Sequence, residues 1–99
     1  MLNITKKTNA SELTVALTGR LDTATAPELE QALKVSLDGV TALILDMTAL
    51  DYISSAGLRV LLSAQKIMNR QGAMKVVGVN ETIMEIFEVT GFSDILTIE

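Results

Sequence analysis

Asp51-Tyr52-Ile53-Ser54-Ser55-Ala56-Gly57-Leu58 is the stretch that decides how this chain folds, because it joins a strand-like apolar run to an amphipathic helical pattern. From Gly57 onward, apolar residues recur at spacings of three and four, which predicts a helix that Gln71-Gly72 ends. Two adjacent hydroxyls, Ser54 and Ser55, therefore stand at a predicted helix N-terminus, where backbone N–H groups lack partners within the helix. A hydroxyl can cap such an end, and the macrodipole stabilises a phosphate there. The stretch is interpreted as a helix cap or as a regulatory switch.

The residues before this stretch alternate between strand and helix signals. Residues 42–45 are apolar without alternation, which is typical of a strand covered on both faces in a parallel or mixed sheet. Residues 11–18 alternate with a period of two and predict a strand that Gly19 ends, and residues 2–6 predict another. Thr25-Ala26-Pro27-Glu28 has the spacing of a capping box and opens a predicted helix over residues 26–37. The buried stripe of that helix is expected to be Ala26, Leu29, Leu33 and Leu37.

The residues after the long helix continue the same alternation. Residues 74–79 predict a strand, Asn80 is expected to cap a helix that ends before Gly91, and residues 94–98 predict a last edge strand. The order β-β-α-β-α-β-α-β favours an α/β sheet with right-handed crossovers. We therefore expect one domain over residues 1–99, with a mixed, mostly parallel sheet of about five strands and helices packed on it.

Composition excludes several classes of function. The 99 residues contain no cysteine and no histidine, so thiolate metal sites and the usual base of a serine hydrolase are missing. A net charge of −4 and only 3% aromatic residues argue against a nucleic-acid partner. No segment approaches the roughly 18 consecutive apolar residues of a membrane span, and no secretory signal is visible. We expect a cytoplasmic protein that is not an enzyme, does not insert into the membrane and carries no cofactor.

Two further features bear on chemistry. Gly57 stands in the first helical turn, where glycine costs about 1 kcal/mol relative to alanine, so it indicates tight packing or close approach by another backbone. No acidic residue occupies positions 55–58, so the helix start lacks the carboxylate that would complement its dipole and suits an anion that arrives later. Asp22, Asp46 and Asp51 could be metal ligands or solvated loop residues, with Asp46 expected to end a parallel strand. The second interpretation is favoured, and no metal is predicted.

The chain resembles a known family over almost its whole length. The matching elements are Gly19-Arg20-Leu21-Asp22 with Thr25-Ala26, then Leu45-Asp46-Met47-Thr48, then the run from Tyr52 to Leu62. Together they resemble a STAS domain, specifically a bacterial anti-sigma factor antagonist. The family's phosphoacceptor lies two residues before the motif glycine, which corresponds to Ser55. Many members have an aspartate just before the acceptor, and Ser54 here adds a second candidate hydroxyl.

The resemblance also implies partners. In this family an anti-sigma factor that is also a serine kinase phosphorylates the antagonist, and a serine phosphatase restores it. The unmodified form binds the anti-sigma factor and frees the sigma factor, so transcription is regulated by partner switching. The expected partner-binding residues are Asp22, Thr23, Thr25, Asp46, Ser54, Gly57, Leu58 and Arg59. The protein is expected to be a monomer or a weak dimer.

A second interpretation comes from a different class of protein. A STAS domain can also be a subunit of a membrane assembly for lipid or anion transport, where it binds an ATPase or a permease. In that setting Ser55 need not be modified.

Overall fold

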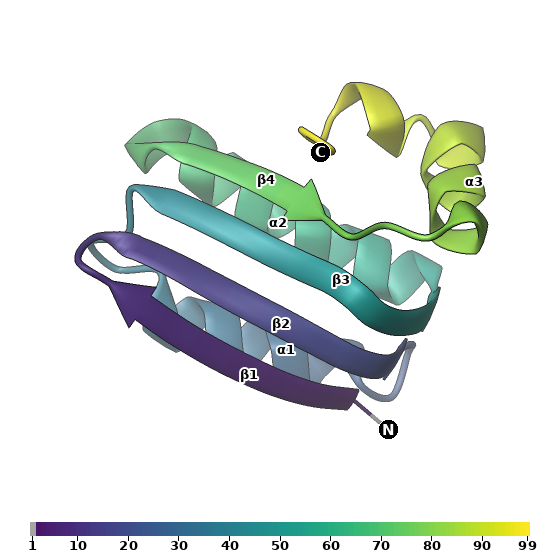
Figure 1. Cartoon of the computed structure of the whole chain (residues 1–99), viewed down its shortest axis with the longest axis horizontal. Helices are drawn as coiled ribbons and strands as arrows, with labels where there is room; N and C mark the ends of the chain where they lie inside the picture. The colour runs from purple at the N-terminus through teal and green to yellow at the C-terminus, as the bar shows by residue number, and fades with distance from the viewer. Residues whose placement is uncertain (1) are drawn as a thin grey trace.

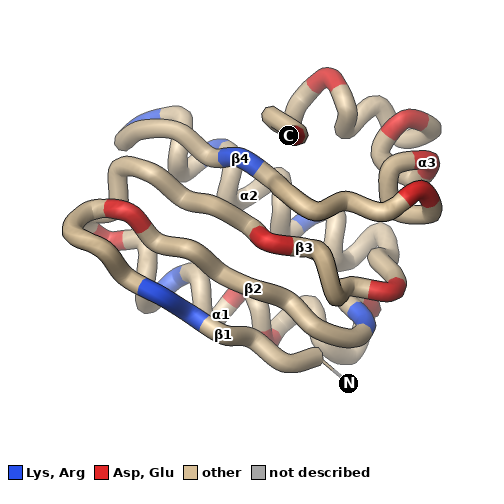
Figure 2. The backbone as a smooth tube through the Cα atoms, in the orientation of Figure 1, with Lys and Arg blue, Asp and Glu red and all other residues tan. Residues whose placement is uncertain are grey.

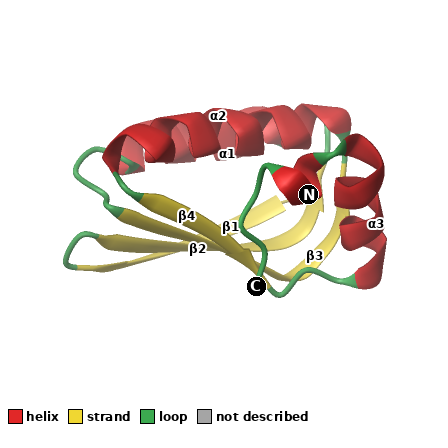
Figure 3. Cartoon of the chain, turned by 90° about the horizontal axis from the view of Figure 1, so that it is seen from above, coloured by secondary structure: helices red, strands yellow, loops and turns green. Residues whose placement is uncertain are grey.

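The computed structural model describes residues 2–99, so Met1 of the predicted domain lies outside the described residues. A four-stranded sheet in the order β1-β2-β3-β4 carries two helices on one face, and a third helix stands at one end (Figures 1 and 3). The elements are β1 (Leu2–Asn9), β2 (Glu12–Leu21), α1 (Ala26–Ser36), β3 (Ala42–Ile53), α2 (Ser55–Gln71), β4 (Ala73–Val77), α3 (Glu81–Thr90) and a 3₁₀ turn (Phe92–Asp94). β1 is antiparallel to β2, and the other two pairings are parallel. The predicted mixed α/β architecture is confirmed.

The predicted fifth strand is wrong. Residues 92–94 form the 3₁₀ turn, whose hydrogen bonds continue to Leu96, and Ile95 has helical backbone angles. Only the chain end reaches the edge of β4: Val76 N–H donates to the Thr97 carbonyl at 2.8 Å, and Glu99 N–H donates to the Val76 carbonyl at 2.9 Å. Because part of the predicted strand lies in this turn, a single bridge between Val76 and Ile98 is formed in place of a fifth strand.

Two strands run further than predicted. Gly19 does not end β2, because its φ of 104° allows an irregularity in the ladder, and the strand continues to Leu21. β3 extends to Ile53, so the prediction that Asp46 ends a parallel strand is wrong. Register shifts between β2 and β3 move the later buried residues out of strict alternation, which obscured the strand in the sequence. Both strands therefore end together, next to the start of α2.

The core lies between the sheet and helices α1 and α2 (Figure 3). The predicted stripe of α1 is confirmed, since Ala26, Leu29, Leu33 and Leu37 are all buried. Burial of this apolar face stabilises each helix on the sheet, at about 1.5–3 kcal/mol for each large aliphatic side chain. In residues 2–99 none of the helices has the length and apolar content needed to cross a bilayer.

The third helix has the predicted cap and the predicted end, and it is attached to β3. Asn80 caps α3, with its side-chain oxygen accepting from Ile83 N–H at 2.9 Å, and Gly91 ends the helix with a φ of 81°. The Asn80 side-chain amide also donates to the Leu50 carbonyl at 2.9 Å. Ile83 and Phe87 are fully buried. The cap and these two side chains hold α3 rigidly at the end of the sheet where β3 ends.

Candidate functional site

Ser54 is the structural cap at the junction of β3 and α2. Its backbone is extended, its side-chain oxygen accepts a long hydrogen bond of 3.4 Å from Gly57 N–H, and its own N–H donates to the Leu21 carbonyl at 2.9 Å. The side chain is half-buried. Ser54 therefore satisfies one of the backbone donors that a helix start leaves without a partner, and it ties α2 to the end of β2.

Ser55 occupies a different position, although it is the next residue. It is the first residue of the 17-residue helix α2 and its side chain is exposed. The first turn of α2 contains no acidic residue, so no carboxylate of that turn complements the positive end of the helix dipole. The arrangement separates the two hydroxyls: one caps the helix, and the other faces solvent at a point that favours negative charge.

Gly57 sets how deeply the start of α2 sinks onto the sheet. A Cβ atom at this position would lie 2.7 Å from Leu21 Cγ and 2.9 Å from Ile53 Cγ1, which is too close for real atoms. The predicted tight packing is confirmed, and the close neighbours are side chains from the ends of β2 and β3. Leu58 is buried beside it, 6% exposed, so Gly57 and Leu58 position the site from beneath.

The loop between β2 and α1 lies beside Ser54, because it begins directly after Leu21, whose carbonyl accepts a hydrogen bond from Ser54 N–H. The Asp22 carboxylate accepts from the backbone N–H groups of Ala24 and Thr25, both at 3.0 Å. The buried Thr25 hydroxyl donates to the Arg20 carbonyl at 2.8 Å and accepts from Asp22 N–H at 2.8 Å. The capping-box prediction for Thr25 is wrong, since its hydroxyl is engaged with this loop and makes no cap bond to α1. Asp22 and Thr25 thus fix the loop's shape and expose Thr23.

Acid is expected to destabilise this loop. The Thr25 backbone N–H, helped by the Thr25 hydroxyl, Ala24 N–H and Arg20, holds the pKa of Asp22 below its usual range. Hydrogen bonds from Thr48 lower the pKa of Asp46 in the same way. A carboxyl whose pKa is depressed by folding contributes stability above its unfolded pKa and loses it as pH falls through the folded value. The free energy of unfolding should therefore decrease as the pH is lowered below about 4.

The measurement is urea unfolding at neutral pH and at acid pH. A variant that combines Asp22→Asn with Asp46→Asn should lose less stability on acidification than the wild type, because neither amide titrates. Parallel pH curves for the two proteins would contradict this account.

Arg20 and Tyr52 flank the same junction, and the sequence analysis did not assign them a role. They face each other across β2 and β3, with the Arg20 guanidinium carbon 4.4 Å from the centre of the Tyr52 ring. Arg20 also pairs with the Asp22 carboxylate at 3.7 Å, although both side chains are partly exposed and the pair adds little stability. The pairing of Arg20 with Tyr52 in the register of β2 and β3 is the signal that would have predicted this cation–π contact.

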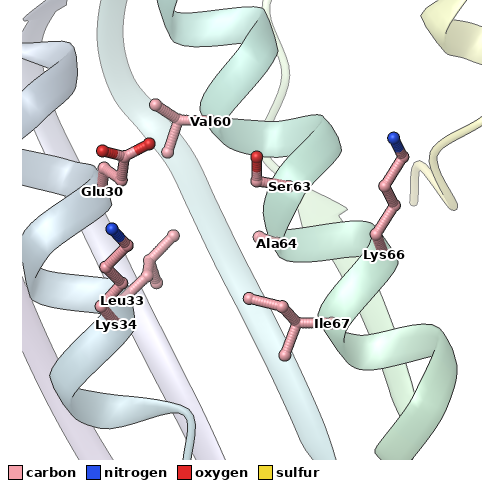
Figure 4. Close-up of a pocket in the computed structure, with 8 residues that line it drawn as sticks. All are labelled: Glu30, Leu33, Lys34, Val60, Ser63, Ala64, Lys66 and Ile67. Carbon is pink, nitrogen blue, oxygen red and sulfur yellow. The ribbon is translucent and has the colours of Figure 1, made fainter.

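A hollow of about 140 Å³ separates the Asp22 loop from the start of α2. Its wall includes Thr23 and Pro27 on one side and Ala56 and Arg59 on the other, so Thr23 and Arg59 line the same hollow. Glu30 and Val60 also line a larger groove of about 320 Å³ between α1 and α2, which Figure 4 shows with Leu33, Ala64 and Ile67. No sequence pattern indicates this groove, because it depends on how far apart the two helices lie.

Asp46 stands apart from the other predicted site residues. It lies in the middle of β3 on the sheet face away from α1 and α2, and its carboxylate accepts from the Thr48 hydroxyl at 2.6 Å and from Thr48 N–H at 3.0 Å. The structure therefore gathers Asp22, Thr23, Thr25, Ser54, Ser55, Gly57, Leu58 and Arg59 at one end, and leaves Asp46 outside this group. Within residues 2–99 no three acidic side chains come together as a cation site would require.

The fold and the serine pair at the β3–α2 junction agree with the family that the chain matches. The family model of the STAS domain matches residues 2–99, so this chain belongs to the STAS domain family. Among curated relatives, the anti-sigma-B factor antagonist of Listeria monocytogenes is 32% identical over 97 residues, which cover 95% of this chain and 84% of the relative.

Solved structures share the fold. An anti-sigma factor antagonist from Mycobacterium paratuberculosis has a TM-score of 0.89 at 24% identity, and the match covers 99% of this chain and 85% of that one. The phosphorylated form of the Bacillus cell fate determinant SpoIIAA has a TM-score of 0.77 at 15% identity, and the match covers 98% of this chain and 91% of that one. At these identities the likeness concerns the fold alone.

Proposed function

We propose that this protein is an anti-sigma factor antagonist whose binding to its anti-sigma factor is switched off by phosphorylation of Ser55. One observation carries the proposal: the Ser55 hydroxyl is exposed at the acid-free start of a long helix, while Ser54 holds the cap. The name of the Listeria relative, an anti-sigma-B factor antagonist, supports this function over a subunit of a membrane transport assembly. The phosphorylated SpoIIAA structure supports modification within the same fold.

The binding surface we propose surrounds Ser55. It consists of the exposed Thr23 and Arg59 on the two sides of the hollow, with Asp22 and Thr25 holding the loop and Gly57 and Leu58 holding the helix. Asp46 is left as a separate prediction, since it lies in the middle of β3. In this proposal the unmodified chain occupies the anti-sigma factor, and the sigma factor is released.

A phosphate on Ser55 adds about −1.5 to −2 charges at neutral pH. The end of α2 accommodates this charge without a change of fold, because the helix dipole stabilises it. A partner that packs against a neutral hydroxyl must instead desolvate the phosphate and bury it, which costs several kcal/mol. The switch therefore needs only a local change of charge. We further propose that the anti-sigma factor is itself the serine kinase, that a separate phosphatase removes the phosphate, and that this chain has no catalytic activity.

The identity of the acceptor can be tested with single variants. We expect the serine kinase encoded nearest to this protein to phosphorylate the wild type and Ser54→Ala in the presence of ATP, and to leave Ser55→Ala unmodified. Mass spectrometry of the peptide that spans Ser54 and Ser55 measures the result. Because Ser54→Ala removes a cap worth about 1 kcal/mol, its folding is checked by circular dichroism. Phosphate on Ser54 alone would overturn the site assignment, and no modification would support the transport-assembly alternative.

A further inference from the structure

α3 carries an acidic stripe beside an exposed apolar one. Glu81, Glu85 and Glu88 recur at spacings of four and three, so they share one face of the helix. Ile86 and Val89 lie on the adjoining face; Ile86 is partly buried against the core, and Val89 is 87% exposed. Glu85, Ile86, Val89 and Thr90 border a hollow of about 360 Å³. Glu81, Glu85, Glu88 and Val89 are exposed and Ile86 is partly exposed, and we call these five residues the α3 face.

The negative charge of the α3 face is not compensated nearby. Residues 81–99 contain five acidic residues and no lysine or arginine, and Figure 2 shows red segments but no blue one on α3. In the described part of the chain, the ion pairs join Arg20 to Asp22 and Lys75 to Glu99. The three glutamates of α3 therefore have no ion-pair partner within residues 2–99.

This arrangement is unfavourable for α3 itself. Like charges three or four residues apart destabilise a helix, and Glu88 lies near the negative end of the helix dipole, where α3 has no basic residue. An exposed valine on a short helix adds nothing to the core. Several local rules are broken on one face of an otherwise well-capped helix, which is typical of a binding surface.

We propose that the α3 face binds a lysine- or arginine-rich amphipathic helix of a protein partner. The apolar side of that helix packs on Ile86 and Val89, and its cations pair with Glu85 and Glu88, which relieves the repulsion on α3. Charge decides the class of partner, because anionic membranes and nucleic acids are repelled by the same glutamates. The surface is preformed, since Asn80 and the buried Phe87 hold α3 on the end of β3. The proposal uses no residue of the β3–α2 junction, so it stands independently of the Ser55 switch.

The test uses a synthetic amphipathic peptide of leucines and lysines, about four helical turns long. It is titrated into the isotopically labelled protein, and binding is followed by NMR chemical shifts. We expect the shifts to cluster on residues 81–91, and the combined variant Glu85→Lys, Glu88→Lys to weaken binding by at least about tenfold. The matched control Glu12→Lys, Asp38→Lys makes the same charge change at exposed positions outside α3 and should change affinity by less than about threefold.

The outcomes separate the proposal from simple charge attraction. Val89→Ser should also weaken peptide binding, because it removes apolar contact without changing charge. Equal weakening by the control and by the α3 double variant, or shifts spread evenly over the protein, would overturn the proposal. The α3 variants are not expected to unfold, since lysine near a helix C-terminus is favourable. Ser55→Asp should leave peptide binding intact, so failure here and failure of the switch can be told apart.

Discussion

Ser55→Asp is expected to weaken binding to the anti-sigma factor by about a hundredfold, which corresponds to about 3 kcal/mol. The substitution places a permanent negative charge at the exposed start of α2, where the proposed partner contacts a neutral hydroxyl. Burying an unpaired carboxylate in an interface costs several kcal/mol, and the loss appears mainly as faster dissociation. Calorimetry or surface plasmon resonance with the anti-sigma factor measures the effect. An unchanged dissociation constant would eliminate the electrostatic switch.

The same variant should not be less stable. An aspartate in the first turn complements the helix dipole, so the free energy of unfolding is expected to stay constant or rise by about 0.3–1 kcal/mol. Ser11→Asp is the matched control. Ser11 is exposed just before the start of β2, whereas Ser54 contacts the other end of that strand. This control adds the same charge and should leave the affinity within about threefold of the wild type. Weakened binding together with retained stability in Ser55→Asp would identify a local effect at the site.

The sequence predicted what depends on local spacing. The helix over residues 26–37, the Asn80 cap and the stop before Gly91 were confirmed, because periodicity and capping act within a few residues. The length of β3 and the absent last strand were predicted wrongly, since both depend on pairing between distant segments. Thr25 has the spacing of a capping residue, but the neighbouring loop competes for its hydroxyl.

The candidate site was partly predictable for the same reason. Ser54 and Ser55 are interchangeable in a pattern of residue types, and the resemblance alone assigned the acceptor to the second. Only the geometry separates a hydroxyl that bonds to Gly57 N–H from one that faces solvent. The exposed state of Val89 likewise required the structure, because the helical pattern alone does not tell which apolar side of α3 the sheet end covers. The sequence identified the candidate residues, and the structure distinguished their environments.

Gly57→Val is expected to lower the free energy of unfolding by about 3 kcal/mol. Its Cβ would stand 2.7 Å from Leu21 Cγ and 2.9 Å from Ile53 Cγ1, and its methyl groups would press further into both side chains. In a chain of 99 residues this cost lowers the melting temperature by roughly 12–24 °C. Thermal and urea unfolding measure it. The clash opposes the gain of up to about 1 kcal/mol that replacing a helical glycine would otherwise bring.

A double-mutant cycle separates this clash from a general intolerance of the helix start. Leu21→Ala alone should cost about 2–5 kcal/mol, because it leaves a cavity in the core. In the combined variant the valine fills part of that cavity, so the total cost should fall below the sum of the two single costs by at least about 1 kcal/mol. Additive costs would contradict the contact between Leu21 and position 57. Coupling would show that the end of β2 fixes the depth of α2, and with it the position of Ser55.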